Sequence, residues 1–200
     1  RENRRRLAAT DGHRLAYAWM GLEAKLPRQE VSVPRKTVLE LAKLLADSDA
    51  EVKIEISATQ ASFSFGTVEL VSKLVDGKFP DYTRVIPTGH KNQLSIPREL
   101  LRQALSRAAI LSNEKFRGVR WVLTDGTLKI VSSNTEQEEA EETLEVGYKG
   151  DALDIGFNVN YLLDVLNNVA GSEVESRFGD AASSALLSFP TEADFKYVVM

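Results

Sequence analysis

Apolar residues recur at helical spacing in three stretches of the chain. In each stretch they occupy the i, i+3, i+4 and i+7 positions, which lie on one face of a helix. These positions are Val38, Leu41, Ala42 and Leu45 in the first stretch, Leu101, Ala104, Leu105 and Ala108 in the second, and Leu162, Val165, Leu166 and Val169 in the third. The pattern predicts three short helices, each with one face turned towards a core. Pro34 and Pro97 open the first two, at a position where proline is favoured.

Shorter runs rich in β-branched and aromatic residues surround these helices, and polar turns separate them. Such runs predict β-strands. They cover residues 4–12 and 13–22 around a turn at Asp11-Gly12, then 30–33, 51–57, 61–67, 68–76, 94–97, 118–125, 127–133, 141–148 and 153–157, with further strands up to Met200. Residues 77–92 carry two prolines and no period, and they are predicted to be a linker.

The helix motif is repeated at a fixed interval. It reads VPRKTVLELAKLL from Val33, IPRELLRQALSRA from Ile96 and FNVNYLLDVLNNV from Phe157. A period near sixty residues indicates one supersecondary unit used repeatedly, here a strand, a helix and three strands. Two units with their helices on one side of joined antiparallel sheets give an α+β layer fold. Repetition favours a scaffold over an enzyme, because an active site breaks symmetry.

The repeats also predict the domain organisation. Residues 1–90 are expected to hold part of one two-unit domain with the linker, and residues 91–200 a complete second domain. The first residue is not methionine, so the chain is expected to be a fragment. There is no cysteine for a disulfide or a thiolate metal site, and no apolar run of about 18 residues that could span a membrane.

The polar faces of the first two predicted helices are basic, although the chain carries a net charge of −4. The first helix shows Lys36, Glu40 and Lys43, with Arg35 beside them, and the second shows Arg102, Gln103, Ser106 and Arg107, with Arg98 beside them. The third helix shows Asn160, Asp164, Asn167 and Asn168, with no lysine or arginine. For a single helix, a solvated face is the simpler interpretation. Repeat symmetry would place both basic faces on one surface, where they would attract phosphates without reading bases.

The acidic run from Glu136 to Glu142 has two interpretations. As an edge strand, its charges can prevent aggregation, or they can meet a basic edge on another subunit. Catalytic candidates are few. His13 follows the Asp11-Gly12 turn, but no second ligand lies at metal-binding spacing and no catalytic motif is present, so a turn or binding-surface role is favoured.

Six long stretches resemble the bacterial sliding clamps, the beta subunits of DNA polymerase III. They are AATDGHRLAYA from Ala8, VPRKTVLEL from Val33, ELVSKLVDGKFPDYTRVIP from Glu69, RAAILSNEKFRGVRWVL from Arg107, EQEEAEE from Glu136 and GFNVNYLLDVLNNV from Gly156. The resemblance implies three two-unit domains per subunit and a ring of two subunits around duplex DNA, with helices inside and sheets outside. Against that pattern, the chain is expected to lack the first domain, the start of the middle domain and a few C-terminal residues.

The resemblance further implies a hydrophobic cleft that binds a short partner peptide. Carried over position by position, its residues are Thr10, Gly12, His13, Arg14, Leu15, Pro80, Arg84, Val85, Phe116, Asn158, Tyr161, Ser184, Val198, Val199 and Met200. Ala182 stands where a larger apolar residue can occur, so the pocket is expected to be slightly roomier. The alternative is that Leu15, Val198 and Val199 are only core strand residues.

Two other surfaces complete the expectation. The ring seam has Ile110 and Leu111 as its apolar centre and Glu136, Glu138, Glu139, Glu141 and Glu142 as its charged strand, and the DNA-facing residues are Arg35, Lys36, Lys43, Arg102 and Arg107. The implied partners are duplex DNA, the replicative and translesion polymerases, the clamp loader, mismatch-repair proteins and ligase. The full-length protein is expected to be a head-to-tail homodimer in the cytoplasm, associated with the nucleoid, with no cofactor, metal, membrane contact or catalysis. A clamp paralogue that binds DNA or protein without forming a ring remains the alternative.

Overall fold

The computed structural model describes residues 4–23, 26–46 and 48–200. These residues form two compact units. One unit combines the N-terminal hairpin with Tyr82–Met200, and the other comprises Leu26–Asp81. The predicted division into residues 1–90 and 91–200 stays a prediction, while the structure joins the hairpin to the C-terminal half of the chain.

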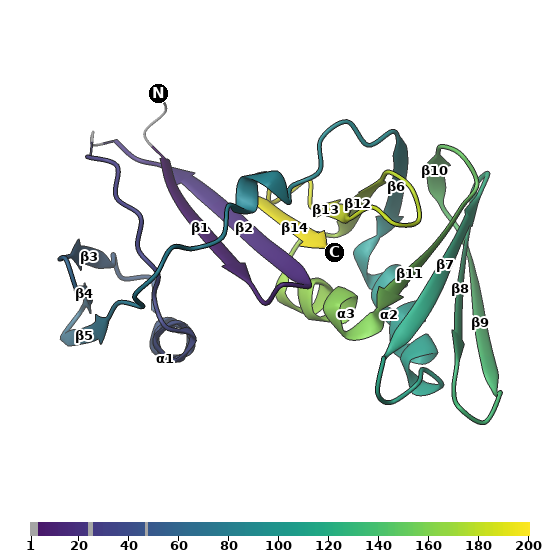
Figure 1. Cartoon of the computed structure of the whole chain (residues 1–200), viewed down its shortest axis with the longest axis horizontal. Coiled ribbons are helices and arrows are strands. Elements are labelled where there is room, and N and C mark those ends of the chain that lie inside the picture. Colours follow the sequence, from purple (N-terminus) through teal and green to yellow (C-terminus); the bar gives the residue numbers. More distant parts are fainter. Residues whose placement is uncertain (1–3, 24–25, 47) are drawn as a thin grey trace. The chain divides into compact units, whose positions relative to one another are not determined.

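The larger unit contains a seven-stranded antiparallel sheet (Figure 1). Its strands, in spatial order, are β1 (Arg4–Thr10), β2 (Arg14–Gly21), β14 (Phe195–Val199), β13 (Ala185–Ser188), β12 (Glu173–Phe178), β6 (Asn92–Pro97) and β10 (Gly147–Lys149). Strand β2 therefore pairs with the last strand of the chain, and Leu15 lies opposite Val198. The predicted hairpin turn is confirmed, because Asp11 Oδ1 accepts hydrogen bonds from the backbone of His13 and Arg14, and Gly12 has a φ of 89°.

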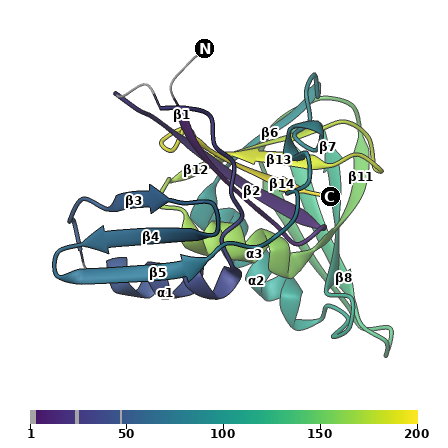
Figure 2. The same ribbon diagram turned by 60° about the vertical axis from the view of Figure 1, so that its left-hand side comes forward.

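A second antiparallel sheet and two helices complete this unit. The sheet order is β11 (Leu153–Asn158), β7 (Gly118–Thr124), β8 (Thr127–Ser133) and β9 (Glu139–Glu145), and the helices are α2 (Arg98–Ile110) and α3 (Val159–Asn168). The 3₁₀ turn Tyr82–Arg84 (η1) precedes β6. Figure 2 shows the helices beneath the seven-stranded sheet, so both helices lie on one side of it.

The helices bury the faces that the spacing predicted. All four predicted apolar residues of α2 are fully buried, as are Leu162 and Leu166 of α3. Val169 is buried too, but it lies just beyond the end of α3. The centre of the core is aromatic: the Trp121 ring makes edge contacts with Phe157 and Phe178, at centroid distances of 5.1 and 6.2 Å.

The smaller unit contains α1 (Arg35–Leu45) and a three-stranded antiparallel sheet of β3 (Lys53–Ile56), β4 (Gln60–Phe65) and β5 (Val68–Lys73). The expected strand at residues 30–33 is wrong. That segment has no strand partner, and only Ser32 O accepts a backbone hydrogen bond, from Val75 N. The predicted inner face of α1 is also not buried here: Val38 is 52% exposed and no residue of the helix is fully covered.

Candidate functional site

The N-terminal hairpin, the last strand and helix α3 meet at one place in the larger unit. Pairing of β2 with β14 puts the hairpin turn beside the chain end, and Met200 N donates a hydrogen bond to His13 O at 2.8 Å. The His13 ring stacks on Tyr161 of α3, with centroids 6.1 Å apart. Thr10 closes the turn, because its hydroxyl donates to Arg14 O and accepts from Gly12 N. Residues from three distant parts of the sequence therefore share this site.

Arg14 holds these parts together. Its guanidinium pairs with Asp11 in the turn and Asp164 in α3, and it lies 4.6 Å from the Tyr161 ring centroid. It also donates to Tyr197 Oη, which in turn donates to Tyr161 O at 3.0 Å. Partial burial acts to lower the pKa of Arg14, but the hydrogen bonds to Asp164, Tyr197 and Asp11 outweigh it and raise that pKa. The cation is therefore permanent, and the site is preorganised around it.

An apolar cluster lies on the face of the sheet turned away from α3. We call it the outer cluster; its buried residues are Leu15, Leu186 and Val198, and the half-buried Ala8, Tyr82, Val85 and Ile86 pack against them. Leu15 is only 1% exposed. The cluster is separate from the main core, so its half-buried members offer apolar surface without opening the domain.

The structure distributes the remaining predicted cleft residues more widely. Val199 belongs to the main core, because alternation along β14 turns it to the opposite face from Val198. Ser184 is half-buried beside β13, and Arg84 is exposed in η1. Pro80 lies in the other compact unit. Asn158 caps α3 by accepting from Asn160 N, and its amide donates to Phe116 O.

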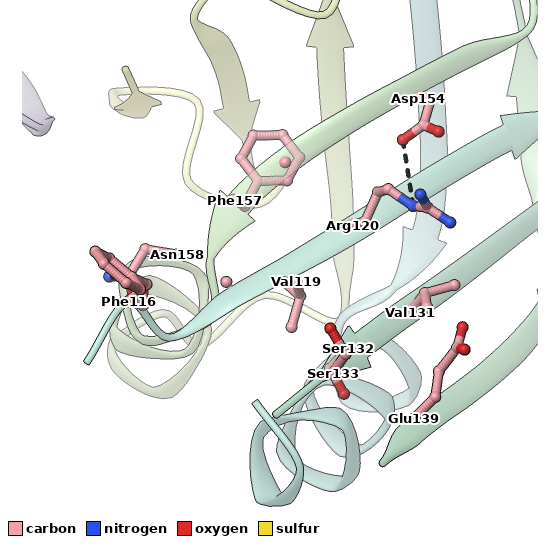
Figure 3. A pocket seen from close by; sticks show the side chains of 12 residues that line it. Phe116, Val119, Arg120, Val131, Ser132, Ser133, Glu139, Asp154, Phe157 and Asn158 are labelled. Carbon is pink, nitrogen blue, oxygen red and sulfur yellow. Dashed lines mark hydrogen bonds and ion pairs between the residues drawn. The ribbon is translucent and has the colours of Figure 1, made fainter. Parts of the chain in front are cut away.

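Phe116 and Asn158 also line a shallow hollow of about 700 Å³ on the four-stranded sheet (Figure 3). The hollow exists because Gly118 and Gly156 present no side chains, and the space above each is open. Arg120 and Asp154 form an ion pair of 3.6 Å along one side of it. None of its lining residues belongs to the outer cluster, so the hollow and the cluster are distinct features.

Sequence reasoning missed Leu186, Ala8, Tyr82 and Ile86 of the outer cluster. Alternation along β13 shows that Leu186 and Leu187 point to opposite faces, but it does not say which face is the core. Tyr82 and Ile86 lie in the predicted linker, where no periodicity exists to indicate burial. The apolar character of their side chains was the only feature of the sequence that indicated burial.

Four of the candidate DNA-facing residues are exposed, Arg102 is half-buried, and three of the five form ion pairs. Arg102 pairs with Glu99, Arg107 with Glu142 at 2.6 Å, and Lys43 with Glu40. The hydrogen bond from Arg102 lowers the pKa of Glu99 to about 2. Within the described ranges, no carboxylate forms an ion pair with Arg35 or Lys36 of α1. That helix belongs to the smaller unit, so a surface shared by α1 and α2 stays a prediction.

The candidate seam lies at the edge of the four-stranded sheet. Ile110 at the end of α2 is 78% exposed, and Leu111 is half-buried. The predicted charged strand is β9, an edge strand that includes Glu139, Glu141 and Glu142. Glu141 pairs with Lys129 and Glu142 with Arg107, while Glu136 and Glu138 precede the strand in a turn held by Asn134.

Across the residues that the structure describes, no group of three or more histidines, cysteines, aspartates or glutamates is arranged to hold a metal ion. None of the described helices combines the length and apolar character needed to cross a membrane.

The same chain matches two family models. Residues 1–81 match the central domain of the DNA polymerase III beta subunit, and residues 83–200 match its C-terminal domain. Among curated relatives, the beta sliding clamp of Pseudomonas aeruginosa is 50% identical over 198 residues, and that of Escherichia coli K12 is 46% identical over 195 residues. Each comparison covers 98% of this chain and 53% of the relative, so the chain spans about half the length of these proteins.

Solved structures agree with these relatives. A DnaN sliding clamp from Pseudomonas aeruginosa bound to griselimycin matches with a TM-score of 0.95 and 48% identity, covering 100% of this chain and 54% of that one. A Caulobacter crescentus beta sliding clamp matches with a TM-score of 0.94 and 40% identity, covering 100% and 53%. The expected α+β clamp fold is confirmed. The chain therefore belongs to the DNA polymerase III beta subunit family of sliding clamps.

Proposed function

We propose that this chain is part of a processivity factor, a sliding clamp that encircles duplex DNA at the nucleoid and holds other proteins there without catalysing a reaction. The docking part of this proposal rests on one observation: the hairpin turn, strand β14 and helix α3 come together beside the outer cluster. An enzyme would need converging reactive groups, and a docking site needs apolar anchors with fixed polar groups around them.

The ligand of this site is a short peptide in extended conformation. Val85, Ile86 and Tyr82 offer apolar surface to its anchor side chains. His13 and Tyr161 supply hydrogen-bonding groups beside them, held in place by Arg14. The proposed partners carry such a peptide: replicative and translesion polymerases, the clamp loader, mismatch-repair proteins and ligase.

The proposed contact with DNA is weak. Arg102 and Arg107 already have carboxylate partners, so each adds little net charge to the surface of α2. Loosely held phosphates permit movement along the duplex, because a closed ring keeps the protein on DNA without tight binding. In the full-length head-to-tail homodimer, Ile110 and β9 form the seam with the other subunit. Complementary charge there fixes the orientation of the two subunits.

Peptide binding can be tested on the 200-residue chain by calorimetry. The peptide contains a glutamine followed by a leucine and a final apolar pair. Binding at micromolar strength, about 8 kcal/mol, is expected. Leu15→Asp is unsuitable as a probe, because it would bury an unpaired charge and test the fold.

Val85→Asp is the better variant, since Val85 is half-buried in a loop. It should weaken binding about tenfold or more, as loss of an anchor does. Val122→Asp is the matched control: Val122 is also half-buried but lies on the four-stranded sheet. Equal affinities for the native chain and Val85→Asp would place the docking site elsewhere.

A further inference from the structure

We propose that the docking site continues along the sheet into a cationic aromatic strip that binds acidic residues adjoining the docked peptide motif. The strip consists of Arg6, Tyr17, Trp19 and Lys196. This inference rests on the proposed docking function and adds the chemistry of the flanking segment, which the family comparison does not supply.

The strip lies on the same face of the sheet as the outer cluster. Alternate residues of a strand share a face, so Tyr17 and Trp19 follow Leu15 along β2. The Tyr17 ring lies 5.3 Å from the Trp19 ring and 5.3 Å from Tyr82, which packs on the outer cluster. An aromatic surface therefore runs from the cluster to Trp19 without a break.

A cation stands on each side of this aromatic row. Arg6 lies opposite Trp19 in the β1–β2 register, and Lys196 lies opposite Tyr17 in the β14–β2 register. Cross-strand partners share one face of a sheet. Lys196 Nζ lies 5.6 Å from the centroid of the Trp19 ring, a cation–π distance. Arg6 is exposed and Lys196 is half-buried.

Neither cation is neutralised within the described part of the chain. No carboxylate there forms an ion pair with Arg6 or Lys196. The nearest carboxylates by register are Asp194, whose backbone oxygen accepts a hydrogen bond from Trp19 N at 2.9 Å, and Glu175, which lies opposite Ser188 across β13. Arg6 and Lys196 outnumber Asp194 beside Trp19, so the strip keeps a positive charge in a chain of net charge −4 and attracts carboxylates.

A peptide segment fits this surface better than a nucleic acid does. From Leu15 to Trp19 the strand rises about 14 Å, which four extended residues cover. The occupant can therefore be the same chain whose anchors lie on the outer cluster. Single-stranded nucleic acids also bind aromatic and basic surfaces, but their affinity depends on neutralising several phosphates, and this strip has two cations.

The test compares peptides that differ only beside the docking motif. One pair carries three glutamates or three glutamines before the motif, and a second pair carries them after it. All four peptides lack tryptophan and tyrosine, so Trp19 fluorescence reports binding at the strip, while the core residue Trp121 is fully buried. Affinities are measured by calorimetry with the 200-residue chain at low ionic strength and again at about 0.5 M salt, where surface charges are screened.

At one of the two ends, the glutamate peptide should bind about three- to tenfold tighter than its glutamine counterpart at low salt. It should change Trp19 fluorescence, and the gain should disappear at high salt. In the double variant Arg6→Gln, Lys196→Gln, the ratio of the two affinities should fall to about one. The control is Lys91→Gln, Lys149→Gln, which removes the same charge from two exposed lysines away from the strip and should keep the ratio.

Three results would overturn the inference. The first is that the glutamate peptide binds no more tightly than the glutamine peptide at either end. The second is that it still binds more tightly in the Arg6→Gln, Lys196→Gln variant. The third is that a single-stranded oligonucleotide binds the strip more tightly than the glutamate peptide does. Binding of the glutamine peptides by the native chain separates the two proposals. If those peptides bind and the glutamates add nothing, only the strip is disproved; if no peptide binds, the docking function itself fails.

Discussion

At the scale of residues, two neighbours on β2, Arg14 and Leu15, point to opposite faces of the sheet. Leu15 points into the outer cluster, while Arg14 points towards α3 and joins Asp11, Asp164, Tyr161 and Tyr197. A planar guanidinium can serve several acceptors at fixed angles, whereas an ammonium group acts as a point charge. The shape of the site therefore depends on the geometry of Arg14 as well as on its charge.

Arg14→Lys should consequently lower stability although the charge is kept. We expect a loss of about 1–2 kcal/mol in urea unfolding, because a lysine cannot hold both carboxylates and the tyrosine hydroxyl. The matched control is Arg120→Lys, since exposed Arg120 pairs with a single carboxylate among the described residues, Asp154, at 3.6 Å. Similar losses for the two variants would show that the fork of Arg14 has no special role.

At the scale of elements, α2 and the edge strand β9 are tied by one ion pair. Arg107 donates two hydrogen bonds to Glu142, which lies on the helix-facing side of β9. The hydrogen bond from Arg107 keeps the pKa of Glu142 below its ordinary value, against a smaller opposing effect of burial. Because the pKa is lower in the folded state, the ion pair stabilises the fold fully at pH values above the pKa of this carboxyl in the unfolded chain. That stabilisation disappears as the pH falls through the lower pKa of the folded state.

Glu142→Gln should therefore melt at a lower temperature than the native chain near pH 7. The two proteins should converge as the pH falls through the lowered pKa of Glu142, because the native carboxylate then becomes protonated and loses its charge. Thermal unfolding followed by circular dichroism at several pH values measures this. Glu139→Gln on the same strand is the control, and it should follow the native chain throughout. A pH-independent difference for Glu142→Gln would indicate a packing effect.

At the scale of the whole molecule, the two compact units differ in how much they bury. Helix α2 has five buried residues, whereas α1 has none among the residues described. Local stability follows the apolar area removed from water, so the units should unfold separately. Under native conditions, hydrogen exchange should show α1 amides exchanging faster than those of α2 and α3. Equal protection of all three helices would mean that α1 is covered in solution.

Exposure of Ile110 and the acidic edge of β9 leads to an expectation about assembly. Like charges on two copies of β9 repel, so edge-to-edge pairing of this strand with itself is disfavoured. Analytical ultracentrifugation of the 200-residue chain at micromolar concentration should show mostly monomer. A salt-resistant dimer abolished by Ile110→Asp would contradict both this expectation and the proposed seam.

Sequence patterns predict the features of this fold that depend on neighbouring residues, and they miss those that depend on pairing between distant segments. Periodicity predicts which residues of α2 and α3 are buried, because it reflects the local geometry of a helix. The strand predicted at residues 30–33 from β-branched composition is wrong, because a strand exists only with a partner. The grouping of Leu15 with Val198, and the separation of Val198 from Val199, depend on pairing across the whole chain, which no local pattern contains.

The pairing of β2 with β14 has a consequence for how the protein is made. Leu15 and Val198 are 183 positions apart, so the hairpin leaves the ribosome long before the strand that it joins in the sheet. At ordinary rates of synthesis this interval is about 10–40 seconds. Until then Leu15 and the aromatic residues of β2 have no neighbour on that side. The site where replication proteins are proposed to dock is thus completed only after β14 has been made, so this face of β2 needs protection in a growing chain.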